Sequence, residues 1–115
     1  MAVSLDDVDF GSVDWSIRQC EETLQFVRET GDYAVLKYVV MDASLGRCGD
    51  EGARLIADVA GFGKPGQDVI ARCIEEITAE REDAKARGHW DVAKRREEIL
   101  RVFDAAAEVE LDRMS

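Results

Sequence analysis

The residue types that carry most enzyme chemistry are sparse in this chain. His89 is the only histidine, which excludes multi-histidine zinc sites and di-iron bundles, since such bundles take a Glu-x-x-His motif from each of two helices. His89 follows Gly88 in a polar stretch, so we expect a solvated turn residue. Carboxylates are numerous, but nothing marks a pocket that would raise one carboxyl pKa for acid–base catalysis. The sequence therefore predicts no catalytic residue, no metal ion and no cofactor, and a protein that is not an enzyme.

One glycine-rich loop invites a phosphate-binding interpretation. Residues 61–66, Gly-Phe-Gly-Lys-Pro-Gly, formally match the GxGxxG pattern of dinucleotide-binding proteins. That fingerprint requires a β-strand before the loop within a βαβ unit, whereas residues 50–59 have the apolar spacing of a helix. The loop also lacks the Gly-Lys-Ser/Thr ending of a Walker loop. The helix-boundary rules favour a tight turn between two helices, with Pro65 near the start of the second.

The three cysteines are Cys20, Cys48 and Cys73, which are widely spaced and form no CxxC pair. This pattern is typical of reduced thiols in a reducing compartment. Cys20 and Cys73 fall on apolar helix faces, which predicts small core residues, whereas the place of Cys48 in a Gly-rich turn is left open. The N-terminus does not resemble a secretory signal, and no apolar run approaches the ~20 residues of a membrane helix. We therefore expect a cytoplasmic protein without a membrane segment.

The longest element that would position these residues is a helical hairpin over residues 67–113 that reverses at Gly88. Antiparallel helices bring residues equidistant from the turn to the same level of their seam. Counting outward from Gly88 pairs Ile77 with Ile99 and Cys73 with Phe103. Apolar positions on each arm recur at steps of three and four, as a helix with one buried stripe requires: Ile70, Cys73, Ile74 and Ile77, then Ile99, Val102, Phe103 and Ala106.

The tip of this hairpin differs from its base. The same count pairs Ala84 with Val92 and sets Arg81 opposite Arg95, and between residues 78 and 98 the only large apolar residues are Trp90 and Val92. The pattern therefore predicts an apolar base and a charged tip.

Trp90 at this tip has two interpretations. It covers the hairpin end as a plug, or it anchors a partner protein together with Arg95 and Arg96. The second interpretation follows because Trp and Arg are among the residue types most enriched at interface hot spots.

Residues 12–60 predict three shorter helices that cover one end of the hairpin. The first begins at an N-cap, Ser12 or Asp14, and ends near Thr30 before Gly31. The second runs from a cap at Asp32 to about residue 45 and the third from residue 50 to about residue 60, each closed by a glycine. Residues 1–11 predict an extended acidic arm. The whole chain, residues 1–115, is thus expected to be one all-α domain with about five helices, in which the shorter N-terminal helices pack on the long C-terminal hairpin.

The net charge of −10 limits the choice of partner. Proteins that bind nucleic acid neutralise its phosphates with Lys and Arg, so we expect no direct nucleic-acid ligand. Acidic residues concentrate near both ends of the chain, while the charged residues in 85–96, around the hairpin turn, are mostly basic. We expect the acidic surface to contact a partner protein, and the residues concerned are Asp6, Asp7, Asp9, Glu108, Glu110 and Asp112.

Two function classes follow from size, charge and the lack of a catalytic motif. The first is a binding protein that inhibits or neutralises a macromolecular partner, of the anti-restriction, anti-CRISPR or immunity type. Its acidic surface would imitate nucleic-acid charge in the channel of a basic nucleic-acid-binding protein. The second is a structural or adaptor subunit that assembles through its helical hairpin, with another protein or with itself as a homodimer.

Overall fold

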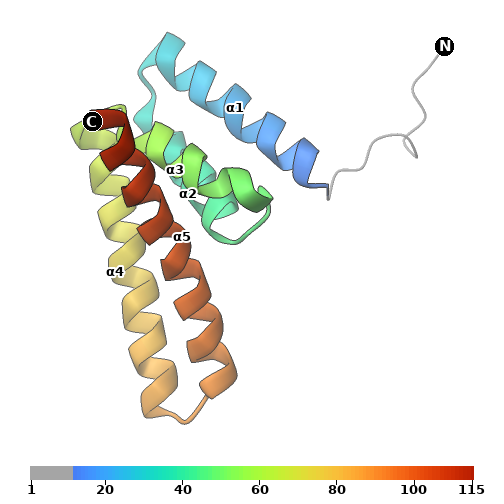
Figure 1. The fold of residues 1–115 in the computed structure, drawn as a ribbon, viewed down its shortest axis with the longest axis vertical. Coiled ribbons are helices and arrows are strands. Elements are labelled where there is room, and N and C mark those ends of the chain that lie inside the picture. The colour runs from blue at the N-terminus through green and yellow to red at the C-terminus, as the bar shows by residue number, and fades with distance from the viewer. Residues whose placement is uncertain (1–11) are drawn as a thin grey trace, which may run out of the picture.

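The computed structural model describes residues 12–115, and within that range the chain is all α-helical with no β-strand. Five helices carry the fold (Figure 1), as the apolar spacing predicts. The extended acidic arm predicted for residues 1–11, with Asp6, Asp7 and Asp9, lies outside the described residues. The helices are α1 (Val13–Thr30), α2 (Leu36–Ser44), α3 (Gly52–Ala60), α4 (Lys64–Ala86) and α5 (Trp90–Met114).

Local capping signals determine where α1 begins and ends. Ser12 is the N-cap, and its side-chain oxygen accepts a hydrogen bond of 3.1 Å from the Trp15 N–H. Gly31 is the C-cap with φ 72°, a left-handed conformation in which its N–H donates to the Val27 carbonyl oxygen at 2.8 Å. Both predicted boundaries of this helix are confirmed.

The second predicted helix is instead two elements. The 3-10 turn η2 (Tyr33–Val35) precedes α2, because the Asp32 side chain accepts from the Ala34 N–H and holds the chain in a tight turn first. A second 3-10 turn, η3 (Gly49–Glu51), likewise precedes α3. The two predicted spans were therefore correct as helical regions, with an irregular first turn in each.

The glycine-rich loop is the tight inter-helix turn that the sequence favoured. It lies between α3 and α4, and Pro65 falls in the first turn of α4. A Cβ built on Gly66 would lie 1.9 Å from the Val59 carbonyl oxygen. The start of α4 therefore approaches the backbone of α3 at a distance that only glycine allows. Because these first residues are helical, the hairpin begins at Lys64 rather than at Gln67.

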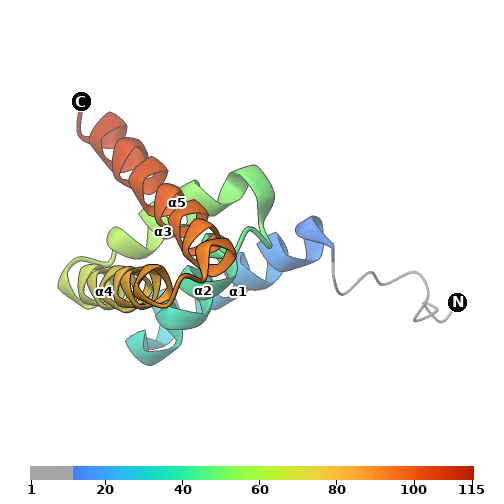
Figure 2. The same cartoon turned by 90° about the horizontal axis from the view of Figure 1, so that it is seen from below.

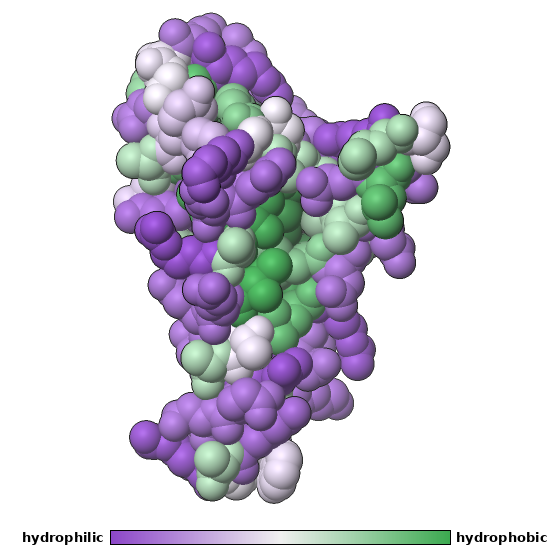
Figure 3. Space-filling view, turned by 90° about the vertical axis from the view of Figure 1, so that its left-hand side faces the viewer, coloured by the Kyte–Doolittle hydropathy of each residue, from purple (hydrophilic) through white to green (hydrophobic). Residues whose placement is uncertain are grey.

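The two arms of the hairpin are α4 and α5, which reverse at Gly88 with φ 74°. The apolar base is confirmed on α5, where Ile99, Phe103 and Ala106 are buried. The matching residues of α4 pack against the same core but are only half-buried: Ile70, Cys73, Ile74 and Ile77. The charged tip is also confirmed, since hydrophilic surface covers the lower end of the molecule while apolar surface lies in a hollow above it (Figure 3).

The predicted register at the tip was wrong in detail. Ala84 and Ala93 are buried, whereas Val92, the predicted partner of Ala84, is 42% exposed. The difference is local, because Glu80 and Arg96, each eight residues from Gly88, do form an ion pair as the equidistant count implies. Arg81 forms an ion pair with Glu97 at 2.9 Å, although the count sets it opposite Arg95. An ion pair therefore links the two helices near the tip, where the prediction set two arginines opposite each other.

All five helices contribute to one hydrophobic core. The short helices lie at the upper end of the hairpin, α3 packs against both α4 and α5, and α1 packs on α2 and α3. Seen from below, α4 and α5 diverge from their turn (Figure 2). Because the short helices lie only at the upper end, the lower half of the hairpin projects beyond them (Figure 1). No helix in residues 12–115 has the length and apolarity required to cross a membrane.

Candidate functional site

Helix α2 carries two apolar stripes on opposite sides. The inner stripe, Leu36, Val39, Val40 and Ala43, is fully buried in the core. The outer stripe points to solvent: Tyr38 is 57% exposed, Met41 50% and Leu45 43%. With the exposed Ala34 of η2, these residues follow steps of four, three and four, the repeat of one helix face. The prediction of this helix rests on the inner stripe alone, although the outer stripe has the same helical spacing in the sequence.

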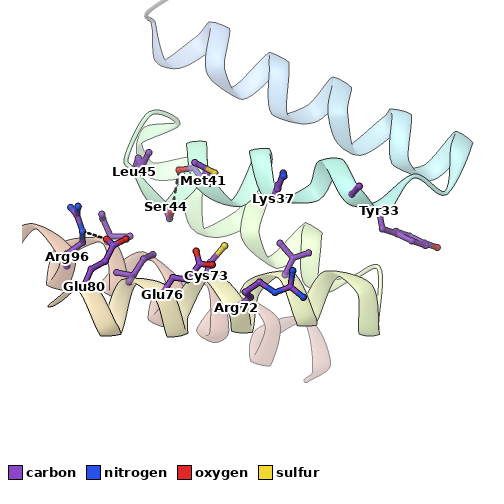
Figure 4. Close-up of a pocket in the computed structure, with 14 residues that line it drawn as sticks. Tyr33, Lys37, Met41, Ser44, Leu45, Arg72, Cys73, Glu76, Glu80 and Arg96 are labelled. Carbon is purple, nitrogen blue, oxygen red and sulfur yellow. Dashed lines mark hydrogen bonds and ion pairs between the residues drawn. The ribbon is translucent and has the colours of Figure 1, made fainter. Parts of the chain in front are cut away.

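A groove of about 590 Å³ lies beside this stripe, between α2 and α4. Figure 4 shows the two helices as its walls, with Met41 and Leu45 on one side and Cys73 on the other. Of the half-buried residues on the α4 side of the hairpin seam, Cys73 and Ile77 line this groove. The apolar lining residues include Met41, Leu45, Val69, Cys73, Ile77 and Ile99.

The two ends of the groove differ in charge. Lys37 and Arg72 lie toward one end, near Tyr33, and within residues 12–115 neither forms an ion pair. Glu76 lies beside Cys73 near the middle of the groove, and the ion pair between Glu80 and Arg96 lies at the other end (Figure 4). The Arg96 Nε atom is 2.6 Å from Glu80 Oε2, so these two charges largely cancel. One end is therefore positive, and the negative charge of Glu76 lies beyond it toward the close-to-neutral other end.

The predicted tip residues do not form one surface. Arg96 lines the α2–α4 groove, while Trp90 lines a separate shallow depression with Lys94 and Arg101. Arg95 is exposed and lines neither hollow. Trp90 is 66% exposed, so most of its side chain lies in water rather than packed into the hairpin end. The role of Trp90 as a partner anchor stays a prediction.

The acidic C-terminal part of α5 forms a row of carboxylates. Asp104, Glu108 and Asp112 are exposed and four residues apart, which places them on one helix face at a spacing of about 6 Å. Glu110 is half-buried and lies on another side of α5. The neighbouring cation Arg113 pairs with Asp58 of α3 at 3.0 Å. The three exposed carboxylates have no ion pair within the described part of the chain.

Two of the cysteines meet in the core. Cys20 of α1 and Cys48, just before η3, are buried with their Sγ atoms 3.7 Å apart. Burial, followed by the charge of Cys48, raises the pKa of Cys20 to about 12, and burial also raises the pKa of Cys48. The prediction of a small core residue is confirmed for Cys20, and Cys48 belongs to the same class. Cys73 is half-buried at the groove.

The remaining chemistry is limited in the described residues. His89 is exposed at the hairpin turn, as predicted. From Ser12 to Ser115 no three His, Cys, Asp or Glu side chains lie close enough together to hold a metal ion. Comparison with known proteins adds no constraint, because no family model, no curated protein and no solved structure matches this chain.

Proposed function

We propose that this chain is a non-enzymatic binding protein that captures a basic macromolecular partner and neutralises it by occupying the partner's nucleic-acid-binding surface. The net charge of −10 supports this proposal. A field of that sign attracts basic proteins over distances beyond direct contact and slows the approach of acidic ones. A partner that normally holds phosphates would offer Lys and Arg side chains to the acidic surface.

The observation that carries the proposal is the unpaired carboxylate row of α5. At the hairpin tip, carboxylates are used internally, since Glu80 and Glu97 pair across the seam with Arg96 and Arg81. At the other end of α5, the row of Asp104, Glu108 and Asp112 has no such internal partner. These exposed, regularly spaced carboxylates are therefore available to a row of cationic side chains on another molecule.

The experiment is capture of the partner from the native host with the tagged full-length protein. We expect a basic nucleic-acid-binding protein among the captured proteins, and its loss when the charge of the row is reversed in the double variant Glu108→Lys, Asp112→Lys. The matched control is Glu22→Lys with Glu75→Lys, two exposed carboxylates of α1 and α4 that also lack ion pairs and produce the same change in net charge. Equal loss in both variants would indicate overall attraction without a specific site, and capture unaffected by either would contradict the proposal.

A second candidate function is that of a structural subunit. The observation that favours it is the outer apolar stripe of α2, because an amphipathic surface helix normally presents charged residues to water on its outer face. Here the subunit would assemble through α2 and its groove, whereas the sequence had assigned assembly to the hairpin.

A further inference from the structure

We propose that the outer stripe of α2 and the α2–α4 groove together form a two-fold interface between two copies of this chain. This inference deepens the second candidate function and is independent of the capture of a basic partner. We call this surface the α2 face. It consists of Tyr38, Met41, Leu45 and the groove-lining residues of α4.

The shape of the α2 face suits self-association. A closed dimer with two-fold symmetry uses the same surface on both copies, so that surface must contain both a projecting part and a matching hollow. The outer stripe of α2 is a ridge of side chains, and the groove beside it is a hollow with an apolar floor. Rotation of one copy by a half turn places each ridge over the other groove, which is the ridge-into-groove packing of helices.

The charges of the groove give the same arrangement. A half turn about an axis through the middle of the groove exchanges its two ends. Lys37 and Arg72 then approach Glu76 of the second copy, and this happens twice in the dimer. A partner with one uniform sign of charge would meet an unfavourable charge. The mixed charge of the α2 face is therefore most complementary to itself.

Folding of the single chain does not account for the outer stripe. The inner stripe of α2 already supplies its contacts with the core. Tyr38 lies beside Lys37, whose Nζ atom is 5.2 Å from its ring centroid, and lines a hollow with Phe26 of α1, yet Tyr38, Met41 and Leu45 all remain exposed. Contiguous exposed apolar side chains on a highly charged protein mark an interaction surface. α2 has only nine residues, about 14 Å of helix, so we expect a transient dimer with an interface in the class below about 1,200 Å².

The first test measures the mass of the full-length protein by sedimentation over a wide concentration range. We expect the mass to rise from monomer to dimer. Leu45→Glu should weaken the dimer at least about tenfold, because it places a charge in an apolar contact. The matched control is Leu111→Glu, the same substitution at a leucine of α5 that is 65% exposed and lies outside the groove. Circular dichroism of each variant confirms that the helices are retained, and Tyr38→Glu repeats the test should Leu45→Glu lose helical structure.

The second test addresses the half-turn arrangement. Lys37→Glu and Glu76→Lys should each weaken the dimer, and the double variant should recover most of the loss, because the reversed charges again meet across the interface. Recovery of the dimer with unchanged unfolding midpoints separates contact between copies from contact within one chain.

Several results would overturn the inference. A protein that stays monomeric at every concentration has no such interface, even where it still captures a basic partner through α5. A dimer that dissociates with Leu111→Glu but not with Leu45→Glu uses the end of α5 instead. A monomer that binds another protein in a Leu45-dependent way uses the α2 face for a different partner.

Discussion

The Sγ atoms of Cys20 and Cys48 lie 3.7 Å apart in the core between α1 and the start of η3. Burial raises the pKa of Cys20 from the ordinary thiol value of 9.0 to about 12. The thiolate fraction of Cys20 at pH 8 is therefore about a thousandfold below that of an ordinary thiol. Since thiolate is the reactive form, the folded protein protects this pair by both burial and protonation.

Alkylation by iodoacetamide checks this protection. We expect Cys73 to be labelled first in the native protein, because it is half-buried at the groove. Cys20 and Cys48 should be labelled together and at the rate of unfolding, since both need α1 to move. Mass spectrometry of peptides resolves the three sites. Rapid labelling of Cys20 with Cys48 still protected would contradict a shared, closed environment.

Truncation of three side chains to alanine tests the burial order along the hairpin. Phe103 is 5% exposed, so Phe103→Ala should lower the free energy of unfolding by about 3 to 5 kcal/mol. Ile77 is half-buried at the groove, and Ile77→Ala should cost about 1 to 2 kcal/mol, roughly half the usual range for a buried isoleucine. Trp90→Ala should stay within about 0.5 kcal/mol, as for other surface changes.

Urea unfolding of the same three variants gives these values. A large loss in Trp90→Ala would restore the plug interpretation. A larger loss in Ile77→Ala than in Phe103→Ala would mean that the core extends into what we describe as a groove.

At the scale of the elements, two glycines test how the hairpin is attached and how it turns. Gly66 approaches the Val59 carbonyl too closely for any Cβ, whereas Gly88 has positive φ with open space around it. Gly66→Ala should therefore destabilise by about 3 kcal/mol, the upper end of overpacking costs. Gly88→Ala should cost about 1 kcal/mol, from backbone strain alone. Thermal melting of the two variants gives the order, and a stable Gly66→Ala protein would rule out the close contact between α3 and α4.

The sequence predicted the helices well because their signals are local. Ser12 and Gly31 specify the ends of α1 through caps that involve neighbouring residues only, and Gly88 marks the turn of the hairpin. Helix rotation is different. Whether Val92 or Ala93 is buried depends on how closely the two helices approach, which no local pattern specifies. The equidistant count correctly pairs Glu80 with Arg96 but does not indicate the pair of Arg81 with Glu97.

The candidate surfaces could be predicted only in part. The apolar repeat of Tyr38, Met41 and Leu45 was readable in the sequence, but its exposure depends on which stripe of α2 the rest of the fold covers. Glu108 and Asp112 were identified from charge alone, and helix geometry then added Asp104 to their row. The contact between Cys20 and Cys48 joins residues 28 positions apart, so no local pattern indicates it.

For the molecule as a whole, the two proposed interactions differ in how strongly they depend on salt. Capture of a basic partner joins unlike charges, so added salt should weaken it. Dimerisation brings together two bodies of charge −10, and salt screens both their repulsion and the attraction of Lys37 and Arg72 for Glu76 while leaving the apolar contact of the α2 face intact, so the dimer should depend only weakly on salt. The two surfaces are therefore separable in one protein by a change of ionic strength.

If the acidic surface holds a basic partner, the affinity for the captured partner must depend on salt concentration. We predict that the affinity of the wild-type protein falls as salt rises. The slope should be flatter in the double variant Glu108→Lys, Asp112→Lys than in the control Glu22→Lys, Glu75→Lys. An affinity that is independent of salt, or a slope that both variants leave unchanged, would contradict charge-based capture by this protein.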